Sequence, residues 1–544
     1  MQHFNIITRR GFLDRSLKIG LGVALSTLTD IPLVMKRALA EGNIGLNGKK
    51  LLFIFLRGAN DSLNSLIPIE DPAYAPNRPK INIPKNSTPG WYSTATGLMD
   101  DFSGAAGFPT QAVRAGNGFA AVHPSLKFLA PVYNAGDLAM IHRVGYPKQS
   151  RSHFDSQNYW ENGNPNDNLS KDGIFYRTLI ESGLANTSPL TGISIQSALP
   201  LLFRGSDAAL TNLSDPTRFK LLGIPNSAAG QLKATNNILA ANKFTFPDKK
   251  SRGLLNLQYQ NMASVFDLIN PALFSDAQNT FKDANGNYLF PTSNAKNGNG
   301  SGVANYVVDT GAYGFFTNLK AAALILNETD AIIAGTELGG FDTHNDQITN
   351  NPTAATFDPF SGAHANLQKR VGWAIYALRH FFMNYADKAT WNNTVVVTLS
   401  EFGRTTVQND TFGTDHAEGG AMFVAGGTIK GYNKRSAGST GIYGCHTSDA
   451  YNGVAVPWVP GAATGTTGSM FGASSRYLKR AVDYRSVLGE LIRDHLGATQ
   501  PQLDRIIPGY AVTGEKLRLG GVTGASSATS KTDGTTIAGE LDLV

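Results

Sequence analysis

Short blocks of consecutive apolar residues recur along the chain, each bounded by glycine and polar residues. A block that is apolar at nearly every position suits a strand buried on both faces, as in a parallel sheet. Blocks of this kind occupy residues 49–56, 138–145, 191–195, 330–336, 395–399 and 422–427. Residues 364–382 instead repeat apolar positions about every 3.6 residues, which predicts an amphipathic helix. The pattern predicts an α/β protein with a mostly parallel central sheet.

Further helices are expected from about residue 124, at 254–268 and at 483–492. With 544 residues and 42% hydrophobic content, the chain can bury a sizeable core. We expect one large domain over residues 41–510, with an insertion at about 163–310 and long loops. Residues 511–544 are rich in Gly, Ser, Thr and Ala, a composition that predicts a flexible tail.

Acidic residues and histidines follow several of the predicted strands. They are Asp61, Asp342, His344, Glu401, Asp415 and His416. Because binding groups of open α/β sheets cluster beyond the carboxyl ends of strands, we expect these side chains to meet. Carboxylate plus imidazole is a ligand set for zinc, manganese or iron, so a metal site is the first hypothesis. Taken alone, Asp61 fits a helix N-cap or a turn equally well.

The polar stretch at residues 150–161 follows the strand at 138–145. We place it at a helix N-terminus, where Ser152 is either a capping residue or a nucleophile aimed at a bound phosphate or sulfate. A Ser-His-Asp hydrolase using Ser152, His153 and Asp155 is a weaker interpretation. Those residues are close in sequence and converge poorly, and no Gly-x-Ser-x-Gly elbow surrounds the serine.

The first forty residues have the pattern of an export signal. Arg9 and Arg10 precede an apolar stretch at 17–28 and an Ala-Leu-Ala sequence at 38–40, as in a twin-arginine signal with its cleavage site. We therefore predict recognition by the twin-arginine translocation machinery and a periplasmic or secreted protein. The alternative is a cytoplasmic protein whose first helix carries two arginines. No later stretch reaches the roughly 20 apolar residues that span a bilayer, so no stable transmembrane segment is expected.

The predicted signal accounts for most of the net positive charge of the chain. The chain has 47 basic and 41 acidic residues, and without residues 1–40 these fall to 41 and 39, a net charge of +2. The basicity is therefore no argument for nucleic-acid binding. Cys445 is the only cysteine, which excludes an intrachain disulfide, a cysteine zinc cluster and an iron–sulfur centre.

Five motifs together resemble the DUF1501 family, exported bacterial proteins related to the alkaline phosphatase and sulfatase superfamily. The resemblance runs from about residue 48 to about residue 500. The motifs are Leu56–Asp61, Arg151–Asp155, Gly339–His344, Ser400–Arg404 and Gly413–His416. The resemblance implies an alkaline-phosphatase-like three-layer sandwich with a mostly parallel central sheet and long loop insertions.

The resemblance also implies a divalent metal: zinc, manganese or calcium. The superfamily's aspartate after the first strand matches Asp61, its Asp and His from one loop match Asp342 and His344, and its final histidine matches His416. The full predicted ligand set is Asp61, Asp342, His344, Glu401, Asp415 and His416.

For the nucleophile of that superfamily, Ser152 is the best-placed match and Ser62 the second. His153 or Arg57 would then steady the leaving group or the anion. Two departures from the family pattern stand out. Glu401-Phe402 replaces an Asp-His pair at the strand end, and a phenyl ring cannot coordinate metal. Asn60 replaces a glycine, which a tight turn tolerates.

These features together predict a metal-dependent hydrolase or transferase acting on small-molecule or glycan phosphate or sulfate esters. Such chemistry needs a cation to offset charge on the transferred group. The competing interpretation is a non-catalytic exported binding or envelope-assembly protein with a degenerate phosphatase-like site. Phe402 favours that interpretation. The acids and histidines that the chain retains at the other predicted ligand positions argue against it.

Overall fold

The computed structural model describes residues 44–93, 97–185, 190–208, 210–216, 228–243, 279–297, 307–447, 456–461, 469–472, 476–510 and 528–544, with the single residues 224, 259, 263, 274 and 517. The predicted export signal lies outside the described residues. So does the predicted helix at 254–268, apart from two of its residues.

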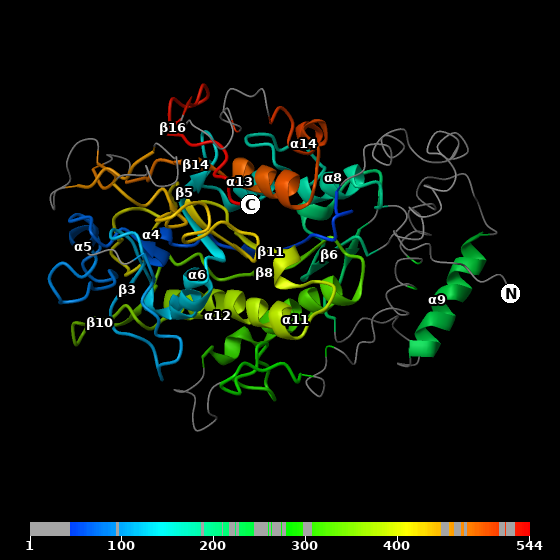
Figure 1. Cartoon of the computed structure of the whole chain (residues 1–544), viewed down its shortest axis with the longest axis horizontal. Helices are drawn as coiled ribbons and strands as arrows, with labels where there is room; N and C mark the ends of the chain where they lie inside the picture. Colours follow the sequence, from blue (N-terminus) through cyan, green and yellow to red (C-terminus); the bar gives the residue numbers. More distant parts are fainter. Residues whose placement is uncertain are drawn as a thin grey trace.

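A mixed sheet of nine strands runs through the centre of the described part of the chain (Figure 1). Its order is β13-β5-β12-β11-β1-β8-β6-β7, with β14 paired to β5. The strands are β1 (Lys50–Leu56), β5 (Leu138–Gly145), β6 (Gly192–Ile195), β7 (Thr211–Asn212), β8 (Ile333–Leu338), β11 (Thr394–Leu399), β12 (Gly420–Gly426), β13 (Ile442–Tyr443) and β14 (Val482–Asp483). The sheet is mixed, because β12 runs antiparallel to both β11 and β5, whereas the other paired strands of this sheet run parallel.

Helices cover both faces of this sheet (Figure 1). Residues Leu52, Ile54 and Leu56 of β1 belong to the core that contains α11 (Tyr313–Glu328) and α12 (Ala363–Asn384). The alternate residues of β1, from Leu51 to Phe55, belong to the opposite core with α8 (Ile174–Glu181), α13 (Tyr484–Glu490) and α14 (Gln500–Ile506). Because both faces of β1 are covered, the strand is apolar from Leu51 to Leu56.

The predicted helix at 364–382 is α12, and the predicted helix at 483–492 is α13 followed by the π-helical segment η9 (Leu491–His495). The pattern from residue 124 forms a 3₁₀ segment, η1 (Pro124–Leu129), that continues as α6 (Ala130–Asn134). The other helical segments with described bounds are α4 (Ser62–Ser65), α5 (Tyr74–Asn77), α7 (His153–Asn162), η2 (Leu201–Phe203), α9 (Ala228–Lys243), η6 (Thr310–Ala312) and η7 (Trp391–Asn393).

Small sheets lie outside the central one. They are formed by β2 (Leu66–Ile67), β3 (Val113–Arg114) and β4 (Ala121–Val122), by β9 (Thr349–Asn351) with β10 (Thr356–Asp358), and by β15 (Ala528–Thr529) with β16 (Thr536–Ile537). Among the described residues, no helix is both long and apolar enough to cross a membrane.

The predicted tail, 511–544, includes residues 528–544, which the structure describes. After the β15–β16 hairpin, Leu541 and Leu543 are buried, at 1% and 0% exposure, in the core that contains α13. The Glu490 carboxylate in α13 accepts hydrogen bonds from the backbone N–H groups of both leucines. These two apolar residues remove surface from water within a segment whose composition as a whole is polar.

Candidate metal centre

Strands that run in one direction bring the centre together at one edge of the sheet. β1, β8 and β11 are parallel neighbours, and β5 runs the same way because β12 is antiparallel to both β11 and β5. Asp342 follows β8, His153 follows β5, and His416 lies in the loop between the end of β11 and the start of β12. Segments far apart in the sequence therefore meet beyond the carboxyl ends of the strands.

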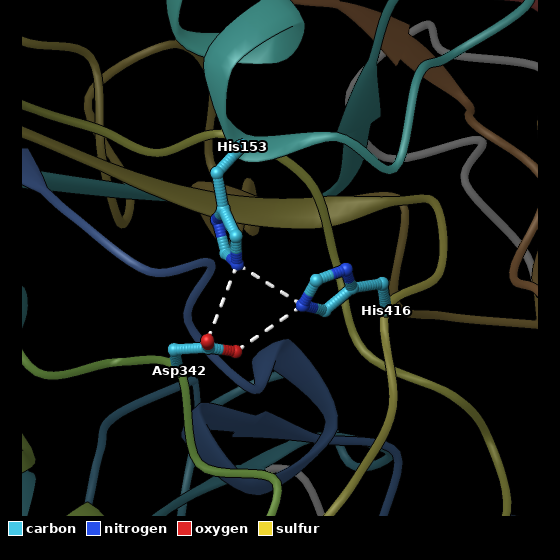
Figure 2. Close-up of side chains that lie close together, drawn as sticks. All are labelled: His153, Asp342 and His416. Carbon is cyan, nitrogen blue, oxygen red and sulfur yellow. Dashed lines mark hydrogen bonds and ion pairs between the residues drawn. The ribbon is translucent and has the colours of Figure 1, made fainter.

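Three imidazoles and one carboxylate converge there. The Nε2 of His416 lies 3.0 Å from the Nε2 of His153 and 2.8 Å from the Nε2 of His344. Asp342 Oδ1 lies 3.1 Å from His344 Nε2 and 3.2 Å from His416 Nε2, and its Oδ2 lies 3.4 Å from His153 Nε2. Figure 2 shows His153, Asp342 and His416 pointing toward one another from separate segments. The donor atoms of His416 and Asp342 thus lie close to the Nε2 atoms of both His153 and His344.

The other nitrogen of each ring faces an oxygen acceptor. The pairs are His153 Nδ1 with Glu401 Oε2, His344 Nδ1 with Asp415 Oδ1 at 3.2 Å, and His416 Nδ1 with the backbone oxygen of Arg151 at 2.8 Å. Carboxylates and carbonyls only accept hydrogen bonds, so each Nδ1 carries the hydrogen. The Nε2 of each neutral ring then keeps its lone pair, directed at the common point. Acceptors behind metal-binding histidines orient the rings in this way.

The nitrogens lie close to the spacing of ligands on one cation. Zinc–imidazole bonds are about 2.0–2.1 Å long, so two nitrogens in tetrahedral coordination lie about 3.3 Å apart. The Nε2 separations of 2.8 and 3.0 Å are a few tenths of an ångström shorter than this value. Ligand atoms of His153, Asp342 and His416 all lie within 4.8 Å of one another. A set of three nitrogens and one carboxylate suits zinc, manganese or iron, and it disfavours calcium, which takes oxygen ligands.

The charges around the centre keep the carboxylate ionised. Partial burial raises the pKa of Asp342, but the hydrogen bond and charge of Arg404 outweigh burial and lower the pKa to about 2. The hydrogen bond to Glu401 raises the pKa of His153, whereas burial and then the Arg404 charge lower the pKa of His416. The adjacent rings therefore differ in their affinity for a proton, and His416 favours its neutral, metal-binding form.

A buried arginine joins the loops of the centre. The side chain of Arg404 is 0% exposed, and its Nη2 lies 2.5 Å from Asp342 Oδ1. It also donates to the backbone oxygens of Ala59 at 2.9 Å, Phe341 at 3.0 Å and Thr414 at 3.2 Å. One guanidinium thereby connects the loops that follow β1, β8 and β11.

Two glycines permit these loops to approach one another. Gly58 has a φ of +105°, and a Cβ there would lie 2.4 Å from the backbone nitrogen of Asp342. A Cβ at Gly413 would lie 2.2 Å from the backbone oxygen of His344. The Gly58 N–H also donates to Glu401 Oε1 at 2.8 Å, so this turn helps to hold the carboxylate behind His153. A larger residue at either position would push the ligand loops apart.

Asp61 supports the centre from the interior instead of joining the donor cluster. Its carboxylate is fully buried, with Oδ2 2.7 Å from Arg78 Nη1 and 2.8 Å from Gln347 Nε2. Gln347 in turn accepts hydrogen bonds from the hydroxyls of Thr343 and Thr414, which are neighbours of His344 and Asp415 in sequence. The metal-binding role predicted for Asp61 is thus replaced in this geometry by an ion pair that anchors the ligand loops.

Glu401 and Asp415, also predicted as ligands, contact the far side of the histidines and not the central point. Phe402, which directly follows Glu401, is 1% exposed. Its ring centroid lies 5.0 Å from that of His153 and 4.8 Å from that of His416. The phenyl ring forms an apolar wall against two ligand rings and leaves donors for one cation.

Ser152 is the N-cap of α7, and its Oγ accepts a hydrogen bond from Asp155 N at 3.4 Å. The side chain is exposed one residue before His153. Both ring nitrogens of His153 contact other residues of the centre, and the Asp155 carboxylate accepts a hydrogen bond from Asn168. The three residues therefore do not form a catalytic triad.

Arg57 lies outside the donor cluster. Its guanidinium pairs with Glu161 at 2.7 Å and with Glu337 at 3.0 Å, and it stacks on the Phe55 ring at 3.8 Å. Two carboxylates already offset its charge, so it is poorly placed to bind a substrate anion.

Sequence reasoning assigned His153 to the leaving group and missed it as a donor. The available signal was its position after the strand at 138–145, but that signal requires the direction of β5 to be known. The roles of Arg404, Arg78 and Gln347 were also missed, because a buried hydrogen-bond network leaves no periodic pattern in a sequence.

A family model described as a protein of unknown function (DUF1501) matches residues 48–448, about three quarters of the chain. The chain belongs to the DUF1501 family. No curated protein and no solved structure matches it. The matched region contains all four donors of the centre, their three acceptors and Arg404, so the whole arrangement lies within the part shared with DUF1501.

We predict that Arg404→Lys destabilises this DUF1501 protein. A lysine cannot reach the three loops at once, and each buried oxygen left without a donor costs about 1–3 kcal/mol. The free energy of unfolding in urea should fall by about 2–6 kcal/mol. The exposed Arg204→Lys is the matched control and should change it by less than about 0.5 kcal/mol. Equal stability of both variants would remove Arg404 as the connecting element.

Asp61→Asn tests the buried ion pair. Burial alone raises the pKa of Asp61, but the charge and hydrogen bond of Arg78 outweigh it, so the net pKa is lowered. A lowered pKa contributes stability above about pH 4 that is lost as the pH falls through the folded-state value. At pH 7 the variant should lose about 3–5 kcal/mol.

Urea unfolding of wild type and variant between pH 7 and pH 3 checks this expectation. The stability difference should narrow only toward the acid end of the range. Exposed Asp330→Asn is the control and should show no such convergence. A difference that does not change with pH would argue against the ionised pair.

Proposed function

We propose that this DUF1501 protein is an exported metal-dependent hydrolase or transferase that acts on phosphate or sulfate esters, built on an alkaline-phosphatase-like variant of the α/β fold. The observation that carries the proposal is the convergence of His153, His344, His416 and Asp342, with an acceptor behind each ring. The export component rests on the twin-arginine pattern at residues 1–40.

In this proposal the four donors hold one divalent cation, and each protein group has a defined task. A cation at this point would supply Lewis-acid stabilisation of negative charge on the transferred group. Glu401, Asp415 and the Arg151 carbonyl fix the Nδ1 hydrogens and thereby the direction of each Nε2. Arg404 keeps Asp342 ionised, so that it remains a ligand at neutral pH.

Ser152 is the proposed nucleophile. Its hydroxyl is exposed, adjoins His153, and accepts a long hydrogen bond through oxygen, which leaves the O–H free to turn. Attack of Oγ on the phosphorus or sulfur would form a serine ester as the bond to the alcohol oxygen breaks. The hydroxyl proton is lost and the departing oxygen gains one, and water then releases the acid and restores the serine.

The second candidate is a non-catalytic metal-dependent binding protein. Phe402 favours it, because the buried phenyl ring occupies the position where a further imidazole would be needed for a second cation. N-capping of α7 also explains Ser152 without chemistry. Metal content and ester turnover, measured separately, distinguish the two candidates.

We predict that His344→Ala loses both bound metal and ester turnover. Elemental analysis of the purified protein should show the metal lost. Turnover of aryl phosphate or sulfate esters should fall by about 100-fold or more, because the charge stabilisation supplied by a cation is worth several kcal/mol. His380→Ala is the control. It removes a half-buried histidine of α12 and should keep both the bound metal and the turnover. Full metal content and activity in His344→Ala would refute the site.

A pair of substitutions separates nucleophile from cap at position 152. Asparagine caps a helix about as well as serine but has no hydroxyl, whereas threonine keeps both functions. Ser152→Asn should retain metal and change the unfolding free energy by less than about 1 kcal/mol, yet lose turnover. Ser152→Thr should retain part of the turnover. Steady-state kinetics of both variants are the measurement, and an active Ser152→Asn would exclude the serine as nucleophile.

A further inference from the structure

Two large apolar side chains, Phe154 and Leu169, are much more exposed than the others of their kind among the described residues. Phe154 is 83% exposed and Leu169 is 85% exposed, whereas the other exposed large hydrophobic side chains of the described residues reach at most 52%. Phe154 directly follows His153 in α7. Single exposed apolar residues are common on protein surfaces, so the pair is informative only if its members lie together beside the centre.

A hydrogen bond brings the two side chains into the same region. Asn168 Nδ2 donates to Asp155 Oδ1 at 3.0 Å, and Phe154 and Leu169 each adjoin one of these bonded residues in sequence. The loop around Leu169 is also held locally, because its N–H donates to Asp167 Oδ1 at 2.7 Å. Leu169 is therefore exposed on a hydrogen-bonded loop that contacts the first turn of α7 through Asn168.

A cation lies on the same rim. The exposed Arg151 precedes Ser152, and its guanidinium stacks on the Tyr477 ring at 4.5 Å. The backbone oxygen of Arg151 accepts the hydrogen bond from His416 Nδ1, which ties this residue directly to the donor cluster. Burial raises the pKa of Glu418, and the nearby Arg151 charge opposes this rise, so the charge of Arg151 is partly offset on one side. The segment at the start of α7 thus carries an exposed cation, Arg151, and an exposed apolar side chain, Phe154, and the loop of Leu169 is bonded to it through Asn168.

We propose that the centre selects anionic esters whose alcohol part is aryl, with the anionic group at the donor cluster and Arg151 and the ring packed on Phe154 and Leu169. Burying the two exposed side chains against a ring removes apolar surface from water and favours such a ligand over one of equal charge without a ring. The position of the anionic group rests on the proposed function. The preference for an aryl group rests on the two exposed side chains.

Phenylphosphonate and methylphosphonate test this inference, because they share a head group, resist hydrolysis at the carbon–phosphorus bond and differ in the apolar substituent. Isothermal titration of the zinc-supplemented full-length protein gives both dissociation constants. Wild type should bind phenylphosphonate about tenfold more tightly or better, as expected for burial of an aromatic ring. Phe154→Ala and Leu169→Ala should each lower this ratio several-fold, and Phe154→Leu should keep most of it.

Met383→Ala removes an exposed apolar residue, 52% exposed on α12, and is the matched control, which should keep the wild-type ratio. The inference is overturned if wild type binds neither probe, binds both equally, or keeps its ratio in Phe154→Ala and Leu169→Ala. Loss of binding to anionic lipid vesicles in these variants, with the ratio unchanged, would overturn it in favour of a membrane contact.

Turnover of phenyl phosphate and phenyl sulfate, measured on the same proteins, separates this inference from the proposed function. The expected binding ratios without turnover would refute the hydrolase and leave the aryl preference standing. If wild type turns over the esters but binds phenylphosphonate and methylphosphonate equally, the hydrolase stands and the aryl preference is refuted.

Discussion

The geometry of the centre depends on one buried guanidinium. Arg404 has no exposed surface, and it donates to oxygens from the loops after β1, β8 and β11 as well as to Asp342. A buried cation requires both a counter-charge and a full set of acceptors, since an unpaired charge in the interior costs several kcal/mol. Here the acceptors come from separate segments, so satisfying the arginine also places the ligand loops. The planar fork of arginine can do this, whereas the point charge of a lysine cannot.

The oxygen acceptors behind the histidines determine which nitrogen of each ring carries the hydrogen. Glu401, Asp415 and the Arg151 carbonyl each occupy an Nδ1, so the three Nε2 lone pairs face inward. Glu401 and Asp415, which the motifs predict as metal ligands, therefore contact histidine rings of the centre instead. The separation of roles has a physical basis, because a carboxylate behind a ring both fixes its orientation and increases its basicity.

Asp61 and Phe402 lie beside the donor cluster. Asp61 follows β1, and its carboxylate is fully buried against Arg78 and Gln347. Phe402 likewise stands where an imidazole was expected and packs on two ligand rings. Neither residue therefore contributes a donor atom to the cluster of His153, Asp342 and His416.

The sequence by itself determined the six longer strands of the central sheet and the helix α12, because short continuous apolar blocks bounded by glycine and polar residues favour buried strands and a 3.6-residue repeat favours a helix. It also located Asp342, His344 and His416 after strands that end at one edge. The direction of β12, and with it the edge at which His153 arrives, was decided by strand pairing between distant segments, which no local pattern records. The separation of ligands from their supports was decided by tertiary structure as well. Asp, Glu and His can each be a ligand or support one, and the sequence is the same in both cases. Only the atoms that the side chain contacts in the folded protein show which role it has.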